Sequence, residues 1–168
     1  SNTLRGDLME WAVAHLLRIP LGERDDWAAY DLRSGKITIQ VKQSSYLQGW
    51  AQKKLSTPHF SGLRVQPWDP ETGDFLDSGY HCDWYVFALL QCTDASRWNP
   101  LDLDQWIFYI IPRATVERYN CKSIGLVALD KLTRENDAHR MTAVELRSRG
   151  RELMGLEGDE GIVVPEPE

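Results

Sequence analysis

Apolar and polar side chains alternate cleanly over residues 36–42. Every second position is apolar and the positions between are polar: Ile37, Ile39 and Val41 against Lys36, Thr38, Gln40 and Lys42. A period of two is typical of a β-strand with one buried face. Because the turn-forming residues Arg33-Ser34-Gly35 come just before it, we predict a hairpin of two strands, 28–32 and 36–42.

This hairpin places one acid beside its polar face. Asp31 lies opposite Thr38 if the turn is a tight one, and opposite Gln40 if the register moves by two residues. In both registers Asp31 shares the face of Gln40 and Lys42, whereas a shift of one residue would place it on the apolar face.

Residues 6–18 predict a helix that ends before Pro20. The stretch is largely apolar, so Glu10 is conspicuous among its helical neighbours and is expected to point into the protein. The alternative is that Asp7 and Glu10 only complement the positive end of the helix dipole.

The rest of the chain indicates an α/β fold. The predicted elements are buried central strands at 84–91 and 105–111, a helix at 114–119, a strand at 123–129 and a last helix from the capping box of Thr142 and Glu145 to Met154. Residues 44–80 follow neither the strand nor the helix period, so no element is assigned there. Strands interleaved with helices are the order of an α/β domain.

Length and composition favour one globular domain. The chain has 168 residues, of which 42% are hydrophobic, so it can bury a core without disulfides or a structural metal. We assign a single domain to residues 3–154 and an acidic, disordered tail to residues 155–168. Three cysteines without a C-x-x-C pair indicate free thiols, and four scattered histidines give little support to a zinc site.

The sequence also bears on location. No apolar run approaches the ~20 residues that cross a bilayer, and no basic-then-apolar leader opens the chain. We therefore expect a soluble, cytoplasmic protein with no membrane association. We expect Ser1 and Asn2 to be a remnant of tag removal, and the chain to begin inside a longer natural protein.

Positive charge is concentrated in one part of an acidic chain. The net charge is −6, but six acids and no base lie in residues 152–168. No acid lies between Asp31 and Asp69, where six bases are found: Arg33, Lys36, Lys42, Lys53, Lys54 and Arg64. Such a patch suits a polyanion such as nucleic acid, and a solvated loop that lacks acids is an equal alternative.

Within this patch four residues are candidate nucleic-acid contacts. Lys53, Lys54 and Arg64 can bind phosphates. Trp50 lies among these bases and can stack on a nucleobase, although packing in the core is the more common role of a tryptophan.

Four residues form a candidate catalytic site: Glu10, Asp31, Gln40 and Lys42. The first three offer hard oxygen ligands, which Mg²⁺ prefers and Mn²⁺ also accepts, and Val41 can add its backbone carbonyl. A metal so held would bind a scissile phosphate and activate water, while Lys42 would orient that water or offset charge in the transition state. The alternative is a half-exposed hairpin whose polar residues face water.

At this point the sequence resembles a known family. Asp31-Leu32, a short turn and then Ile39-Gln40-Val41-Lys42 look like the PD-(D/E)xK nuclease core of restriction endonucleases, Holliday-junction resolvases and repair nucleases. Residues 6–11 are similar to the first helix of that fold, whose glutamate often joins the metal site. Two positions differ from the pattern, since Tyr30 replaces the proline and Gln40 replaces the second acid. The branch that restricts methylated DNA likewise uses Q-x-K.

The resemblance implies a restriction endonuclease-like core, a mixed central β-sheet flanked by helices. It also implies metal ligation by Asp31 and Gln40 with help from Glu10, and a catalytic role for Lys42. The expected activity is Mg²⁺-dependent endonucleolytic cleavage of DNA, with a homodimer as a means of cutting both strands. The alternatives are a catalytically weak module that binds nucleic acid or a protein partner, and an enzyme that cleaves RNA.

Overall fold

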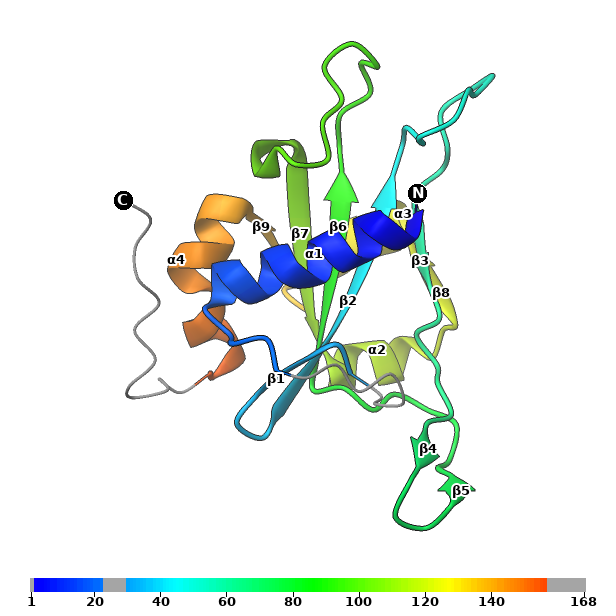
Figure 1. Ribbon diagram of the computed structural model, residues 1–168, viewed down its shortest axis with the longest axis vertical. Coiled ribbons are helices and arrows are strands. Elements are labelled where there is room, and N and C mark those ends of the chain that lie inside the picture. The colour runs from blue at the N-terminus through cyan, green and yellow to red at the C-terminus, as the bar shows by residue number, and fades with distance from the viewer. Residues whose placement is uncertain (1, 23–29, 157–168) are drawn as a thin grey trace.

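A five-stranded mixed sheet lies between two pairs of helices (Figure 1). The computed structural model describes residues 2–22 and 30–156. Its helices are α1 (Asn2–Leu17), α2 (Arg113–Tyr119), α3 (Leu126–Arg134) and α4 (Ala143–Met154). The strands of the sheet are, in spatial order, β1 (Leu32–Ser34), β2 (Ile37–Ser45), β6 (Trp84–Leu90), β7 (Trp106–Pro112) and β9 (His139–Thr142). β2 and β6 are parallel and the other neighbours antiparallel, so the predicted α/β class is confirmed.

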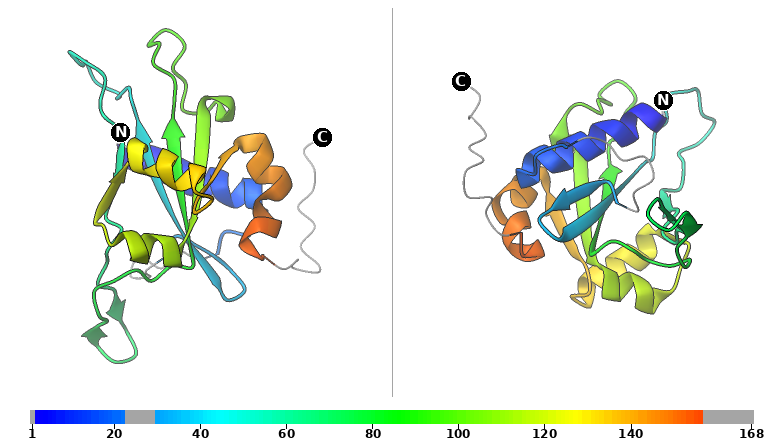
Figure 2. Two further views of the ribbon diagram at one scale, coloured as in Figure 1. Left: turned by 180° about the vertical axis from the view of Figure 1, so that it is seen from behind. Right: turned by 60° about the horizontal axis from the view of Figure 1, so that its bottom comes forward.

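The two long apolar strands have helices on both faces, which explains why almost every position in them is apolar. Along β6, Val86 and Ala88 enter the core with α1 and α4, whereas Tyr85 and Phe87 enter the core with α2 and α3. We call these sides the α1–α4 face and the α2–α3 face. The left view of Figure 2 looks onto the α2–α3 face. Residues 85–90 and 106–111 are all buried, which confirms the predicted central strands.

The hairpin of β1 and β2 covers only the beginning of β2. Leu32 pairs with Ile39 and Ser34 with Ile37, so residues 35 and 36 form the turn. Gly35 has a φ of +59° there, a left-handed conformation that glycine adopts at little cost and that tight hairpin turns require. In the described residues, β2 then continues to Ser45 with β6 on one side and no strand on the other.

The stretch from 123 to 134 is mainly helical. β8 (Ser123–Gly125) ends where α3 begins, so the predicted strand 123–129 is wrong from residue 126 onward. Leu129 and Leu132 are buried at a spacing of three residues, which is helical. A short apolar run fits a strand as well as a helix, and only its packing in the fold distinguishes the two. The sequence pattern also missed β9.

The two terminal helices were predicted more closely. α4 has the expected capping box, since the Thr142 hydroxyl accepts the Glu145 N–H and the Glu145 carboxylate accepts the Thr142 N–H. α1 begins at Asn2 rather than at residue 6. The first two residues of the predicted strand 28–32 and the tail from residue 157 lie outside the described residues. No helix that the structure describes is long and apolar enough to cross a bilayer.

Residues 44–80, for which no element was predicted, contribute three short strands. β3 (His59–Ser61) pairs with β8, and β4 (Trp68–Asp69) pairs with β5 (Asp74–Phe75). The β4–β5 hairpin projects from the body of the protein (Figure 1). Strands of two or three residues are too short to show a period, which is why the sequence pattern did not reveal them.

Candidate functional site

Gln40 and Lys42 project from the α2–α3 face of β2. Their register partners on β6 are Tyr85 and Phe87, which belong to the core on that face, whereas Val41 belongs to the opposite core. Gln40 is only 8% exposed, yet its amide forms no hydrogen bond within the part of the chain that the structure describes. A buried polar group normally has a hydrogen-bond partner. Since the Gln40 amide has none among these residues, its carbonyl oxygen is available to a ligand.

Asp31 is held at the uncovered edge of β2. Its N–H donates to the Ile39 carbonyl at 3.0 Å, and its Oδ2 accepts the Val41 N–H at 2.8 Å. Asp31 therefore lies opposite Gln40, in the second of the two registers considered from the sequence. Because the N–H and C=O of one residue in a strand point to the same edge, the Val41 carbonyl also faces the edge where Asp31 lies.

The Lys42 amine lies against the backbone of Gly62. A Cβ added to Gly62 would come within 3.1 Å of Lys42 Nζ, closer than side chains normally approach, and the glycine has a φ of +69°. Lys42 is half-buried, and its amine forms no ion pair with a carboxylate in residues 2–22 or 30–156. The amine therefore lies beside Gly62, and no counter-ion in those residues holds it.

Two buried side chains hold the segment around Gly62 in place. Phe60 stacks on Phe87, with ring centroids 4.9 Å apart, and Phe87 is the β6 neighbour of Lys42. Leu63 is 1% exposed, and its N–H donates to a carbonyl in the loop before β8. The backbone beside Lys42 is therefore anchored on both sides of Gly62.

The pKa of the buried Cys82 thiol responds to two of the candidate charges. The pKa of this thiol is raised to about 12, chiefly by burial; the Asp31 carboxylate adds to the rise and the Lys42 ammonium opposes it. Both charges therefore lie within electrostatic reach of one residue of the α2–α3 core. Asp31 and Lys42 share a side of the hairpin, in agreement with the strand alternation.

Glu10 comes from the opposite side of the sheet. It is half-buried on α1, whose Val13 packs in the same core as Val41. Glu10 therefore does not lie on the side of the sheet from which Gln40 and Lys42 project, because a helix packed on one face cannot direct a side chain through the strands. Glu10 can meet the other three only around the uncovered edge of β2.

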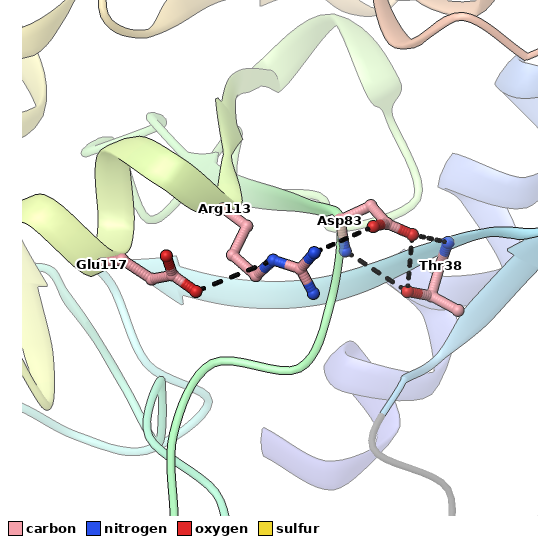
Figure 3. A network of polar contacts seen from close by, with 4 residues as sticks. All are labelled: Thr38, Asp83, Arg113 and Glu117. Carbon is pink, nitrogen blue, oxygen red and sulfur yellow. Dashed lines mark hydrogen bonds and ion pairs between the residues drawn. The ribbon is translucent and has the colours of Figure 1, made fainter.

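Asp83 joins the start of β2 to α2 (Figure 3). Its Oδ2 accepts the Thr38 N–H at 2.9 Å and the Thr38 hydroxyl at 3.1 Å. Its Oδ1 lies 3.5 Å from Nη2 of Arg113. Nε of the same arginine lies 3.7 Å from Oε1 of Glu117. These contacts fix where β2 begins, and they occupy the Asp83 carboxylate with structural partners.

The candidate nucleic-acid contacts lie in two places. Three of them are exposed on the loop that follows β2: Trp50, Lys53 and Lys54. Arg64, also exposed, comes two residues after Gly62, the glycine beside Lys42. The basic stretch of the sequence is thus divided between the catalytic candidates and a separate loop.

The oxygen atoms along the edge of β2 suit a hard cation. The Asp31 carboxylate, the Gln40 amide and the Val41 carbonyl are the types of donor that Mg²⁺ prefers. The described part of the chain contains no cluster of three histidine, cysteine, aspartate or glutamate side chains that could hold a metal. A cation at this edge would therefore depend on one carboxylate, one neutral amide and a backbone carbonyl.

Comparisons with known proteins do not place the chain in a family. No protein-family model matches it, and no curated protein sequence or solved structure does so either. Any assignment of function must therefore come from the hairpin and its surroundings.

Proposed function

We propose that this protein is a metal-dependent nuclease that hydrolyses DNA phosphodiester bonds, and that its sheet and helices form a restriction endonuclease-like core. The observation that carries the proposal is the position of Asp31, whose carboxylate is bound to the Val41 N–H beside Gln40. Lys42 follows on the same strand, and its amine forms no ion pair with a carboxylate of the residues that the structure describes. An acid, neutral oxygen donors and a cation therefore surround one short stretch of β2.

Each residue has a distinct part in this proposal. Asp31, Gln40 and Val41 would hold Mg²⁺, or Mn²⁺ in its place, and the bound ion would polarise the phosphate and lower the pKa of water. Lys42 would orient the attacking water or offset the negative charge that grows on the phosphate. Glu10 is the least supported ligand, because it approaches from the other face of the sheet.

Changing Gln40 to glutamate tests the metal site directly. We expect Gln40→Glu to strengthen Mg²⁺ binding about tenfold, because the charge of the ligands sets the affinity of such sites. Without metal, the new carboxylate faces Asp31, so the melting temperature in EDTA should fall and Mg²⁺ should restore it. Titration calorimetry and thermal melting measure both effects.

The same variant serves in a cleavage assay. Wild type and Gln40→Glu should nick or linearise supercoiled plasmid with Mg²⁺ or Mn²⁺, and EDTA should stop the reaction. If Gln40→Glu leaves metal affinity and metal-dependent melting unchanged, Gln40 does not lie at a cation site.

A second candidate function is a nuclease-fold module that binds nucleic acid or a protein without cleaving. The neutral Gln40 favours it, together with the lack of a three-residue acidic or histidine cluster in the described residues. If neither wild type nor Gln40→Glu cleaves plasmid DNA or single-stranded RNA while wild type still binds nucleic acid, the result supports the binding module. If the protein cleaved RNA but not DNA, its substrate would be RNA instead of DNA.

The loop after β2 should contribute to affinity through charge. Replacing Lys53 and Lys54 together with alanine should weaken duplex DNA binding for every sequence and lower its salt dependence, by up to ~0.9 in the log–log slope for each phosphate that the protein no longer neutralises. Lys131, exposed on α3, is a control whose replacement should change neither quantity. Fluorescence anisotropy at several salt concentrations measures both, and an unchanged slope would place the DNA-binding surface elsewhere.

A further inference from the structure

An apolar groove lies at the end of β2, beyond the candidate site. It has a volume of about 440 Å³ and lies between the first turns of α1, the loop after β2 and the loop between β6 and β7. The side chains that form it include Leu4, Arg5, Leu8, Trp50, Trp98 and Leu101. This volume is in the range of small-molecule sites, roughly 300–1,000 Å³.

The groove keeps large apolar side chains in contact with water. Trp50 is 59% exposed, Leu4 is 68% exposed and Leu101 is 73% exposed. Exposed apolar side chains that gather at one hollow, rather than being scattered, mark a place where something binds. A flat aromatic ligand would cover Trp50 best, because an indole stacks on other ring systems.

The loop that carries Trp50 is held in a defined place. Arg5, only 7% exposed, donates from Nη1 to the Leu47 carbonyl at 3.3 Å and from Nη2 to Gln48 Oε1 at 2.6 Å. These bonds tie the start of the loop to α1 just before Trp50. The groove is therefore built by contacts between segments far apart in the sequence.

Charge is distributed unevenly around the groove. Lys53 and Lys54 do not line the groove, but they are exposed three and four residues beyond Trp50 in the same loop, and neither forms an ion pair among the described residues. The wall formed by the loop between β6 and β7 leads to Asp102 and Asp104. A ligand with an apolar ring and one anionic end would bind with its anion toward the two lysines.

We propose that the groove binds an unpaired nucleobase of a nucleic acid strand, with the base on Trp50 and a neighbouring phosphate on Lys53 and Lys54. This inference rests on the proposed function and adds a substrate class to it, nucleic acid with an unpaired region. β2 connects the two sites, since Lys42 precedes the end of the strand at Ser45 by three residues, or about 10 Å. The groove residues Leu8 and Trp98 pack against the α1–α4 core, whereas Lys42 projects from the α2–α3 face, so one nucleic acid strand would reach both sites by passing around the uncovered edge of β2.

The test compares Trp50→Ala with Trp11→Ala. Trp11 is a matched control, because it is 53% exposed, stacks on His15 and does not line the groove. In EDTA, which prevents cleavage, Trp50→Ala should bind a single-stranded oligonucleotide about tenfold more weakly than wild type, with duplex affinity unchanged. Trp50→Phe, which keeps an aromatic ring, should restore most of the loss, and Trp11→Ala should behave as wild type.

An oligonucleotide of abasic sites separates the base from the backbone. Wild type should bind it as weakly as Trp50→Ala binds the normal strand, since the phosphates remain and only the bases are gone. The proposal that the groove binds a base would be overturned if wild type bound both oligonucleotides with equal affinity. It would also be overturned if the Trp50 and Trp11 variants bound the normal strand with equal affinity. A dimer in light scattering that Trp50→Ala dissociates would assign the groove to a second copy and also overturn it.

The two proposals fail in different ways. Base-dependent binding by a wild type that cleaves no nucleic acid would overturn the proposed catalysis and support the groove. Cleavage without base-dependent binding would do the reverse. A wild type that binds neither single strands nor duplexes would overturn both.

Discussion

Replacing Lys42 with alanine is expected to lower cleavage by ~10²–10³ while leaving the fold intact. The Lys42 amine lies beside Gly62, and no carboxylate in the described residues forms an ion pair with it. A fixed charge that stabilises a transition state costs this much when it is removed. The stem of the lysine is only half-buried, so thermal melting should change little.

The measurement is the initial rate of plasmid nicking with Mg²⁺, with Lys36→Ala as the matched control. Lys36 lies in the turn at the other end of the same strand and is exposed, so its loss should not affect the rate. Asp31→Asn, which keeps an acceptor for the Val41 N–H but removes the charge, should be as inactive as Lys42→Ala. Full activity in both the Lys42 and the Asp31 variants would place the chemistry at another site.

Replacing Gly62 with alanine is expected to lower the cleavage rate at least about tenfold, because small misplacements of a catalytic group are costly. The added methyl group would lie 3.1 Å from the Lys42 nitrogen, and Phe60 and Leu63 anchor the backbone on either side. The flexible end of Lys42 must therefore move away. The effect should fall on kcat rather than on KM, since the amine acts in the transition state.

Gly73→Ala is the matched control for this variant. Gly73 has a φ of +71°, almost the same as that of Gly62, but no atom lies within 4 Å of its added Cβ. Both substitutions carry a similar backbone penalty, about 1–2 kcal/mol, so both should lower the melting temperature by similar amounts. Only Gly62→Ala should reduce cleavage.

The Lys42 amine can also be observed without any activity. In ¹⁵N-lysine-labelled protein, the amine signal assigned through Lys42→Arg should shift in Gly62→Ala and stay in place in Gly73→Ala. Equal cleavage rates and unshifted amine signals in both glycine variants would show that the Gly62 backbone does not position Lys42.

Local chemistry in the sequence determined much of the secondary structure. The alternation over residues 36–42 specifies a strand with one buried face, and β2 has that orientation, with Val41 in the α1–α4 core and Gln40 on the other face. The apolar runs that became β6 and β7 and the Thr142–Glu145 capping box depend on residues close together in the chain. The face that Asp31 shares with Lys42 follows from the same period of two, because hairpin partners are near neighbours in sequence.

Tertiary structure alone decided the rest, because those features depend on residues far apart in the chain. The apolar stretch after Gly125 became α3 because Leu129 and Leu132 pack into the α2–α3 core, a partner that no local pattern specifies. Glu10 lies across the sheet from Gln40 because α1 packs on the face of Val41, and helical periodicity does not say which face a helix will cover. The contact between Gly62 and Lys42 likewise exists only because the Phe60–Phe87 stack and buried Leu63 bring an irregular segment over β2.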